Sequence, residues 1–333
     1  MKKKILLVGG AGYIGTVVTE YLLSKLYNVT CLDSLIYSQK SVIKRFLEKK
    51  NYKFVHGDMR NSSLVSELLK EVNDVVILAG LVGDPITKKY SKESKEINHD
   101  ALMHFINNCN GKNLDKLIFI STCSNYGLMK SEETADEKHR LNPLSSYSEY
   151  KVKIEEHILS LKGKIDYCPV ILRFATAFGL SPRMRFDLTV NEFVKEIFYE
   201  KNLQVYDLDT WRPYCHVNDF ANLIEMILRA KKDKIFFEIF NAGSKENNFT
   251  KREIVNTIGK FLPIDKIEYK EKGSDRRNYR VNFDKVKNVL NFKAKHNLES
   301  GIKELIKYLK LKDYTHFSES SSLFGNYKIF KNE

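Results

Sequence analysis

The first half of the chain alternates between short apolar runs and longer stretches with apolar residues at helical spacing. The apolar runs predict β-strands, at 4–8, 28–33, 53–56, 74–79, 116–121 and 167–173. The stretches between them predict helices, at 13–26, 38–49, 62–70, 93–109 and 147–162. Strands that alternate with helices in this way are typical of α/β proteins. The pattern therefore predicts a doubly wound parallel sheet.

The regular alternation ends near Gly179, and we expect a second, smaller α/β lobe after it. Helices in this lobe are predicted at about 188–200, 250–261, 283–290 and 299–310. A helix at 218–230 and a strand at 235–240 look like a return to the first unit. The two units are therefore expected to interleave. We assign residues 1–179 and about 216–245 to the first unit, about 180–215 and 246–311 to the second, and 312–333 to a tail.

Length and composition allow a large buried core. The chain has 333 residues, of which 43% are hydrophobic, so neither disorder nor a disulfide-dependent fold is indicated. The apolar run at 5–8 is too short for a signal peptide, and no run approaches the roughly 18 residues of a membrane helix. We therefore expect a soluble, cytoplasmic protein.

The cysteines and the net charge exclude two further classes of site. The cysteines lie far apart with no C-x-x-C pair, so we expect reduced structural thiols and no metal site. They are Cys31, Cys109, Cys123, Cys168 and Cys215. The formal net charge is +13, but the lysines are scattered and form no arginine-rich stripe or nucleic-acid motif. We therefore expect no nucleic-acid partner, and a surface that attracts anionic ligands.

A glycine-rich stretch follows the first predicted strand directly. Residues 9–15 read Gly-Gly-Ala-Gly-Tyr-Ile-Gly, and Asp33 stands eighteen residues past the last glycine, at the end of the second strand. Glycines let a pyrophosphate approach the backbone, the helix N-terminus faces its charge, and the acid accepts from ribose hydroxyls. The first unit is therefore predicted to be a Rossmann-type sheet that binds a dinucleotide.

Tyr147 and Lys151 are four residues apart on a predicted helix, so their side chains share one face. A lysine ammonium beside a phenol favours the phenolate, which lowers the tyrosine pKa toward neutrality and makes it a base. Alone, such a pair is more often an ordinary exposed pair on a helix surface. Thr122, however, ends the strand predicted at 116–121, at the edge where α/β sheets bind ligands. Together these residues predict a site that holds a substrate oxygen between a hydroxyl and a phenol.

Over roughly residues 3–310 the chain resembles the extended short-chain dehydrogenases/reductases of the nucleotide-sugar epimerase/dehydratase family. The motifs that carry the resemblance are Gly9-x-x-Gly12-x-x-Gly15, Asp33, Gly57-Asp58-Met59, Leu78-Ala79-Gly80, Ser121-Thr122-Cys123-Ser124-Asn125-Tyr126-Gly127, Tyr147-x-x-x-Lys151, Leu172-Arg173-Phe174 and Arg212-Pro213-Tyr214-x-His216-Val217-x-Asp219. The resemblance implies that Tyr147 is the catalytic base, that Lys151 holds the nicotinamide ribose and that Thr122 aligns the substrate oxygen. It implies NAD and not NADP as the cofactor. Ser34 follows Asp33, and no neighbouring arginine could bind the 2′-phosphate that NADP carries.

The resemblance also implies the residues that contact each ligand. The expected NAD-binding residues are Gly9, Gly12, Tyr13, Ile14, Gly15, Asp33, Ser34, Asp58, Met59, Ala79, Gly80, Leu81, Tyr147, Lys151 and Phe174. The expected substrate-binding residues are Asp84, Thr122, Ser124, Thr176, Arg185, Asn191, Arg212 and Arg277, with Arg183 as a further candidate. Arginine suits the substrate diphosphate because its guanidinium donates two hydrogen bonds at once. Two alternatives stay open: Asp84 could cap the helix that follows it, and any of the arginines could form a salt bridge between the lobes.

Three positions depart from the family pattern. The 4,6-dehydratases carry an Asp-Glu pair directly after the hydroxyl residue, where this chain has Cys123 and Ser124. We therefore reject a dehydratase, because water elimination would lack its acid and base. The 3,5-epimerases carry a cysteine at the position of Ser124. Cys123 is one residue earlier, and in an extended segment its side chain would point to the opposite face from that of Ser124. Thr176 replaces the usual asparagine of a diphosphate contact.

The sequence thus predicts NAD-dependent oxidation at C4 of a nucleotide-linked sugar, by a 4-dehydrogenase or a 4-epimerase. The segment 181–191 resembles the branch that includes GDP-heptose 4-dehydrogenases of surface-polysaccharide pathways more than the galactose epimerases. The alternatives are a 4-keto-sugar reductase, a non-catalytic NAD-binding regulator and an RNA-binding relative. An intact set of catalytic residues argues against the regulator, which needs no base. The resemblance also implies a homodimer, or a higher homo-oligomer, formed by the helices at 93–109 and 147–162.

Overall fold

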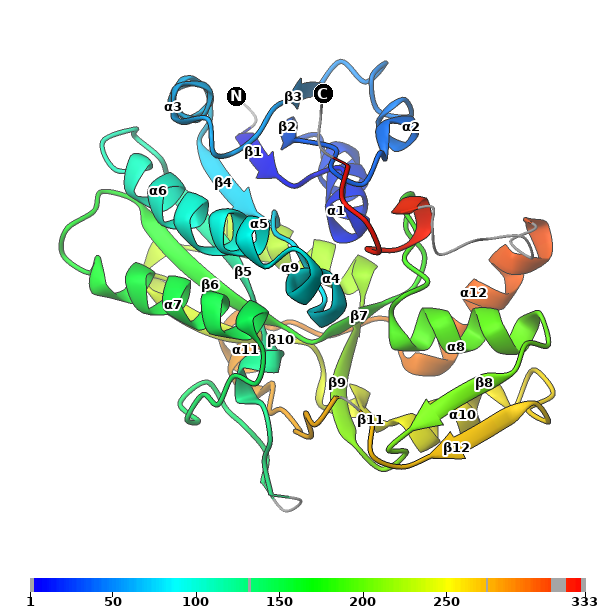
Figure 1. The fold of residues 1–333 in the computed structure, drawn as a ribbon. Helices are drawn as coiled ribbons and strands as arrows, with labels where there is room; N and C mark the ends of the chain where they lie inside the picture. Colours follow the sequence, from blue (N-terminus) through cyan, green and yellow to red (C-terminus); the bar gives the residue numbers. More distant parts are fainter. Residues whose placement is uncertain (1–2, 131–132, 274, 313–321, 331–333) are drawn as a thin grey trace.

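The computed structural model describes residues 3–130, 133–273, 275–312 and 322–330. Within this part of the chain, seven parallel strands form one sheet in the order β10-β6-β5-β4-β1-β2-β3 (Figure 1). The strands are β1 (Lys4–Val8), β2 (Asn28–Asp33), β3 (Tyr52–His56), β4 (Asp74–Ile77), β5 (Lys116–Thr122), β6 (Cys168–Phe174) and β10 (Glu238–Ala242). The predicted doubly wound parallel sheet is confirmed, and the chain returns to it at β10 after leaving it at β6.

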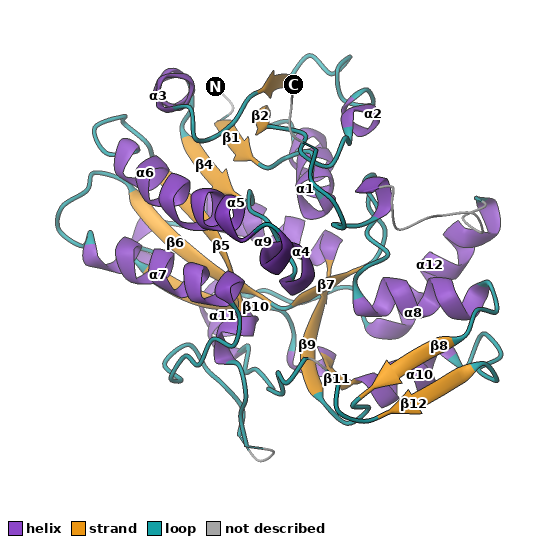
Figure 2. Cartoon of the chain, in the orientation of Figure 1, coloured by secondary structure: helices purple, strands orange, loops and turns teal. Residues whose placement is uncertain are grey.

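Helices cover both faces of the sheet, because successive residues of each strand point to opposite sides. The covering helices are α1 (Tyr13–Ser24), α3 (Ser62–Lys70), α6 (Ala101–Asn108), α7 (Ser146–Ser160), α9 (Val217–Arg229) and α11 (Asp284–Leu290) (Figure 2). In β1, Ile5 and Leu7 share an apolar cluster with α1 and α9. Leu6 and Val8 share a second cluster, on the other face, with α3, α6 and α7. The loops at the carboxyl ends of the strands are therefore held by two separate cores.

The helix predicted at 38–49 is wrong beyond its first turn. The structure has only the short α2 (Lys40–Ile43) there, followed by turns. The N–H of Phe46 bonds to the carbonyl of Ile43, and the N–H of Lys49 to that of Phe46, so these bonds span three residues rather than four. Ile43 and Phe46 are nevertheless buried. The apolar spacing correctly indicated which residues are buried, but these residues lie in tight turns and not in an α-helix.

The helix predicted at 93–109 consists of three parts: α5 (Ser91–Lys95), a π-helical turn (Glu96–Asp100) and α6. A π turn adds a residue to the helical turn and rotates the side chains around it. The side-chain amide of Asn98 accepts from the N–H of Leu81 at 2.8 Å and donates to its carbonyl at 2.9 Å. The turn thereby anchors the loop after β4, which lies at the carboxyl edge of the sheet.

A smaller lobe lies beside the large sheet (Figure 2). Its elements are β7 (Thr176–Phe178), α8 (Thr189–Phe198), β8 (Leu203–Tyr206), β9 (Trp211–His216), β11 (Asn248–Thr250), α10 (Lys251–Ile258), β12 (Ile267–Lys270) and α12 (Leu298–Leu311). The predicted helices are present, but the one predicted at 283–290, α11, packs against β10 of the large sheet and not in this lobe. The strands were not predicted. Each has three to six residues and pairs with a segment far away in the chain, as β8 does with β12.

The remaining regular segments are short. They are α4 (Asp84–Lys89) and the 3-10 turns Cys123–Tyr126, Lys232–Lys234, Lys245–Asn247 and Ser322–Phe324. Among the helices of the described residues, none is both long and apolar enough to cross a bilayer.

Candidate active site

A cavity of about 630 Å³ opens at the carboxyl edge of the large sheet, where the strand-ending loops meet the smaller lobe. Open α/β sheets bind ligands at this edge. The predicted residues that line it are Gly9, Gly12, Tyr13, Ile14, Gly15, Asp33, Ser34, Asp58, Met59, Ala79, Gly80, Asp84, Thr122, Ser124, Tyr147, Lys151, Phe174, Thr176, Arg183, Arg185, Arg212 and Arg277. The fold thus brings to one cavity residues that the sequence spreads from position 9 to position 277.

Two predicted contact residues, Leu81 and Asn191, lie outside the lining that the described residues form. Leu81 is fully buried, and its backbone is bonded to the π-helical turn. Asn191 is also fully buried, and it donates to the Tyr13 hydroxyl at 3.0 Å and to the Arg185 carbonyl at 2.9 Å. Since its amide is committed to the protein, Asn191 braces the segment that carries Arg185 instead of reaching into the cavity.

The turn between β1 and α1 requires glycine at two positions. Gly9 has a φ of +84°, and a Cβ there would lie 2.7 Å from the backbone nitrogen of Ala79. A Cβ on Gly15 would lie 2.3 Å from the carbonyl oxygen of Gly9. Helix α1 has Gly12 as its N-cap, and among the described residues no side chain caps it and no acid stands in its first turn. A helix start of this kind fits an anionic pyrophosphate, so the residues present fit a dinucleotide.

Asp33, at the end of β2, ties the glycine turn to the next loop. One carboxylate oxygen accepts from the N–H of Ala11 at 3.0 Å, and the other accepts from the N–H of Leu35 at 2.8 Å. Burial raises the pKa of Asp33, while these two N–H donors and the positive charge of Arg183 act in the opposite direction. Arg183 is 150 positions away in the chain, so its proximity to Asp33 is a feature that the sequence did not reveal.

The candidate catalytic groups come from two adjacent elements. Thr122 ends β5, and its hydroxyl accepts from the N–H of Ser124 at 3.0 Å. Tyr147 and Lys151 stand in the first two turns of α7, which begins with a capping box formed by Ser145 and Ser148. The Lys151 amine donates to the carbonyl of Ile120 at 2.7 Å and lies 5.9 Å from the centre of the Tyr147 ring. The helix thus presents the phenol to the cavity and directs the amine toward β5.

The pKa of Tyr147 corrects one prediction from the sequence. We expected Lys151 to lower it, but burial raises it, and the charges of Arg185 and Arg277 only partly offset burial. Burial also lowers the pKa of Lys151 to about 7, which the negative charge of Glu155 opposes. Lys151 is buried and Tyr147 is half-buried at the cavity wall, and a low-dielectric surrounding disfavours the charged form of either group.

A buried ion pair supports this helix from behind. Arg173 on β6 donates to Glu155 on α7 at 2.6 and 3.0 Å, and their side chains are 4% and 2% exposed. Glu155 also accepts from the Asn125 amide at 2.9 Å and from the hydroxyl of Ser121 on β5. The pair therefore fastens α7 to both strands that end at the site. Sequence reasoning noted the Leu-Arg-Phe motif but missed this acidic partner, which lies one turn after Lys151.

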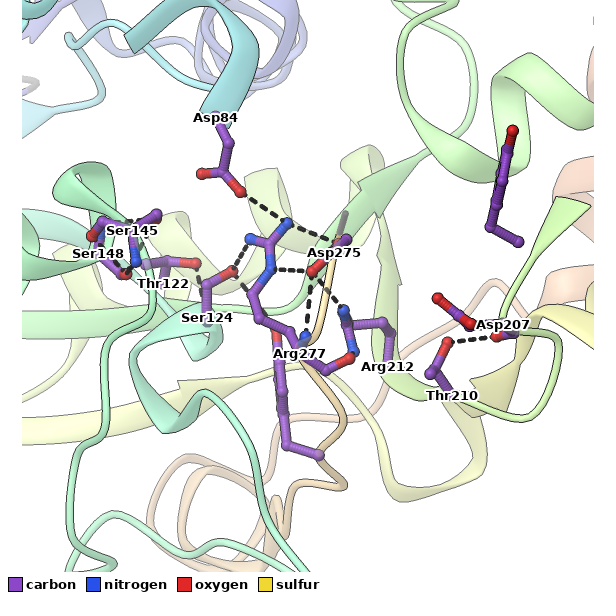
Figure 3. A network of polar contacts seen from close by, with 12 residues as sticks. Asp84, Thr122, Ser124, Ser145, Ser148, Asp207, Thr210, Arg212, Asp275 and Arg277 are labelled. Atoms are coloured by element: carbon purple, nitrogen blue, oxygen red, sulfur yellow. Dashed lines mark hydrogen bonds and ion pairs between the residues drawn. The ribbon is translucent and has the colours of Figure 1, made fainter. Parts of the chain in front are cut away.

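Beside Ser124, four charged groups that line the cavity alternate in sign (Figure 3). Arg277 pairs with Asp84 at 3.1 Å and, through two nitrogens, with Asp275 at 2.7 and 2.8 Å. Asp275 also pairs with Arg212 at 3.0 Å, and Arg277 donates to the Ser124 hydroxyl at 3.2 Å. The N-cap of α4 is Gly83, so Asp84 lies inside the helix and its carboxylate faces Arg277. Asp84 therefore does not cap α4. Its ion pair with Arg277 is a salt bridge between the two units, the alternative that the sequence left open for the arginines, and both residues line the cavity.

The sequence analysis missed the acids that accompany the arginines. Arg185 is bonded to Asp187 at 2.5 and 2.9 Å, as Arg277 is to Asp275. Each acid stands two positions from its arginine, which is a signal that the sequence did carry. These arginines are therefore oriented by carboxylates before any substrate phosphate arrives.

The two positions that depart from the dehydratase pattern differ in environment. Cys123 is 1% exposed, its sulfur lies 3.2 Å from the carbonyl oxygen of Arg173, and burial raises the pKa of the thiol. Ser124 instead lines the cavity, with its hydroxyl 3.4 Å from that of Tyr279. The thiol is thus kept protonated behind the wall, and only the serine hydroxyl is available to a substrate.

His216 has a structural place. Its ring is fully buried, and one nitrogen lies 2.8 Å from a carboxylate oxygen of Glu304 on α12. The other nitrogen accepts from the N–H of Asn218 at 3.3 Å and caps α9. His216 thus joins the end of β9 to two helices.

Comparison with known proteins agrees with this geometry. The model of the NAD dependent epimerase/dehydratase family matches residues 5–243. An uncharacterised UDP-glucose epimerase, YtcB of Bacillus subtilis (strain 168), is 26% identical over 321 residues, covering 92% of this chain and 98% of the relative. The NAD complex of dTDP-glucose 4,6-dehydratase from Bacillus anthracis has a TM-score of 0.80 at 25% identity, covering 93% and 97%.

A further solved structure shares the fold. UDP-glucuronic acid 4-epimerase of Bacillus cereus, in complex with UDP-glucuronic acid and NAD, has a TM-score of 0.83 at 24% identity, covering 92% of this chain and 99% of that one. The family match spans the glycine turn, Asp33 and the candidate catalytic residues. The chain therefore belongs to the NAD dependent epimerase/dehydratase family, as an enzyme of the extended short-chain dehydrogenase/reductase type with NAD as its cofactor.

Proposed function

We propose that the protein oxidises a nucleotide-linked sugar at C4, as a 4-dehydrogenase that releases the ketone or a 4-epimerase that reduces it again. One observation carries the proposal. The hydroxyls of Thr122, Ser124 and Tyr147 share the cavity with the glycine turn, while the neighbouring Cys123 is buried out of it. The site therefore offers groups that handle a hydroxyl proton, and it lacks the carboxylate pair of the dehydratases at positions 123 and 124.

The proposed cofactor site is the part of the cavity around the glycine turn and Asp33. Its residues are those of the expected NAD set that line the cavity: Gly9, Gly12, Tyr13, Ile14, Gly15, Asp33, Ser34, Asp58, Met59, Ala79, Gly80, Tyr147, Lys151 and Phe174. When bound, NAD supplies a hydride acceptor at its nicotinamide ring. Phe174, stacked on Phe220 with ring centres 3.8 Å apart, would give that ring a rigid apolar neighbour.

The protein's own part in the reaction is proton transfer and orientation. Tyr147 takes the proton of the C4 hydroxyl, and Thr122 holds the oxygen in line with it. The positive charges of Arg185 and Arg277 favour the phenolate that this step needs, against the effect of burial. For epimerisation the same phenol returns its proton to the C4 oxygen when the ketone is reduced on its other face. The sugar must then turn within the site between the two half-reactions.

The proposed substrate contacts lie on the smaller lobe, on α4 and in the turn after β5 that contains Ser124. Arg212 and Arg277 are assigned to the diphosphate, since each is already oriented by Asp275. Ser124 and Asp84 would meet the sugar. Thr176 stands where the family's asparagine contacts the diphosphate, and Arg185 is a further phosphate candidate. We propose a hexose or a heptose, with GDP as the first nucleotide to test, because segment 181–191 resembles the GDP-heptose branch. Such a sugar would serve surface-polysaccharide synthesis.

The domain division and the assembly belong to the same proposal. The unit of residues 1–179 and about 216–245 would hold NAD, and that of about 180–215 and 246–311 the nucleotide sugar. Of the tail 312–333, residues 313–321 and 331–333 lie outside the described part of the chain. We expect a homodimer through α5, α6 and α7, which sedimentation or light scattering of the purified protein would test.

A panel of UDP-, GDP-, CDP- and dTDP-linked sugars tests the reaction. A 4-dehydrogenase should raise absorbance at 340 nm in proportion to ketone released, whereas a 4-epimerase should convert the sugar, followed by NMR, without net NADH. Oxidation of NADH by a 4-keto sugar alone would favour the reductase alternative. Protein that carries NAD(H) but acts on no member of the panel would contradict the proposal.

Tyr147→Phe should lower turnover about 10²- to 10⁴-fold, the usual contribution of a general base, while leaving NAD bound. Tyr150→Phe is the matched control, because Tyr150 stands on the same helix and packs against His99 instead of lining the cavity. Wild-type turnover by the Tyr147 variant would refute its assignment as the base.

A further inference from the structure

The C-terminal segment 322–330, which we term the C-terminal strap, lies against three loops of the cavity (red in Figure 1). The N–H of Phe330 bonds to the carbonyl of Ile36, in the loop after β2, at 2.7 Å. The Asn326 amide donates to the carbonyl of Val82, in the loop after β4, at 3.1 Å. Arg183, in the loop before α8, donates to the carbonyl of Gly325 at 3.1 Å. The strap therefore joins the two lobes across one side of the cavity.

Apolar contacts hold both ends of the strap. Ile329 is 8% exposed and shares a small cluster with Tyr37, Leu81 and Ile86. At the other end, the carbonyl of Phe324 accepts from the N–H of Phe186 at 2.7 Å, and the two rings lie 6.2 Å apart. These contacts involve loops, helix α4 and the edge of the apolar core of the smaller lobe, and no strand of the large sheet.

The middle of the strap forms part of the cavity wall. Asn326 and Tyr327 both line it, next to Tyr37 from the loop after β2. Asn326 and Tyr37 are 8% and 6% exposed, yet the side-chain oxygen of each has no hydrogen-bond partner among the described residues. Buried polar atoms are nearly always paired, and an unpaired one costs stability. Both side chains line the cavity, so a polar ligand bound there is a candidate partner for the two oxygens.

The position of these groups identifies the ligand. Tyr37 follows Asp33 by four residues, and Gln39 in the same loop donates to the Asp33 carboxylate at 3.4 Å. Arg183, which holds the strap, lies 4.8 Å from the centre of the Tyr37 ring and acts electrostatically on Asp33. The strap therefore covers a part of the cavity that adjoins Asp33, and its Asn326 N–H also donates to Asp187, the partner of Arg185, at 3.3 Å.

We propose that the C-terminal strap is a wall of the dinucleotide site, in which Asn326 and Tyr37 bind the cofactor and slow its release. The inference rests on the proposed placement of NAD beside Asp33. It adds a consequence for the reaction: a cofactor retained after the first hydride transfer can return the hydride to the same sugar. Retention by the strap would thus favour epimerisation over release of a ketone.

Release of NADH from the purified full-length protein tests the proposal. NADH fluorescence is followed in stopped flow after mixing with excess NAD, for wild type, a deletion of 322–333, Asn326→Ala and Leu323→Ala. The deletion should release NADH at least tenfold faster, and Asn326→Ala about fivefold faster, the factor expected for one hydrogen bond. Leu323 is the matched control, since its side chain is 40% exposed in the same segment, and its variant should behave as wild type.

The outcomes separate this inference from the proposed function. A folded deletion variant that releases NADH at the wild-type rate overturns the strap while leaving C4 oxidation standing. If the deletion does not fold, Asn326→Ala and Tyr37→Phe decide, and wild-type rates in both overturn the strap. Slow NADH release by the wild type and faster release by the strap variants, with no nucleotide sugar converted, would contradict the proposed reaction and support the strap.

Discussion

Replacing Lys151 with methionine should flatten the pH dependence of folding stability between pH 7 and pH 9. Burial lowers the pKa of the Lys151 amine to about 7, whereas its ordinary value is 10.5. Between these two values the unfolded chain binds a proton that the folded chain has lost. Stability of the wild type therefore rises with pH in this window, because it rises wherever the unfolded state binds more protons.

The magnitude follows from the two pKa values of this amine. One pKa unit corresponds to about 1.4 kcal/mol, so burying the amine costs about 4 kcal/mol at pH 7 and about 2 kcal/mol at pH 9. The wild type should therefore gain about 2 kcal/mol relative to Lys151→Met over this range. The variant also loses the hydrogen bond to the carbonyl of Ile120. That loss is the same at both pH values and cancels in the comparison.

Urea denaturation of dinucleotide-free wild type and variant, at pH 7 and pH 9, measures this difference. Other titrating groups are common to both proteins and cancel as well. Lys153→Met is the control, because Lys153 is exposed on the same helix and its replacement should keep the wild-type pH dependence. A stability difference between wild type and Lys151→Met that is equal at the two pH values would refute the reasoning.

Two further predictions concern the supports of the site. Arg173→Met should lower the free energy of unfolding by about 3–5 kcal/mol in urea titration, because it leaves the buried Glu155 carboxylate unpaired. Arg45→Met is the control, because Arg45 and Glu20 form an exposed ion pair. An equal loss of stability in both variants would contradict the argument. Gly15→Ala should abolish NAD binding in calorimetry, because the added Cβ would force the glycine turn apart. Undiminished affinity would show that the turn adapts.

The sequence predicted best those features that neighbouring residues create. The strand Lys4–Val8, the glycine turn and helix α1 are consecutive, and their chemistry follows from the residue types alone. The helical spacing of Tyr147 and Lys151 is equally local. In contrast, the short strands β7, β8 and β12 exist only because distant segments meet them, and they carry no periodicity long enough to detect.

The same difference between local and long-range features applies to the site: the sequence predicted which residues belong to it, but not their contacts or pKa values. The order of residues determined the parallel sheet, the dinucleotide turn and the positions of Thr122 and Tyr147, because those depend on local pattern and on the edge where parallel strands end. Only the tertiary structure decided that Asp84 faces Arg277 and that the C-terminal strap reaches the loop after β4. It also decided that burial raises the Tyr147 pKa. These contacts form between segments that are far apart in the chain. Their strength, and the pKa values of the groups, depend on burial, which cannot be read from the order of residues.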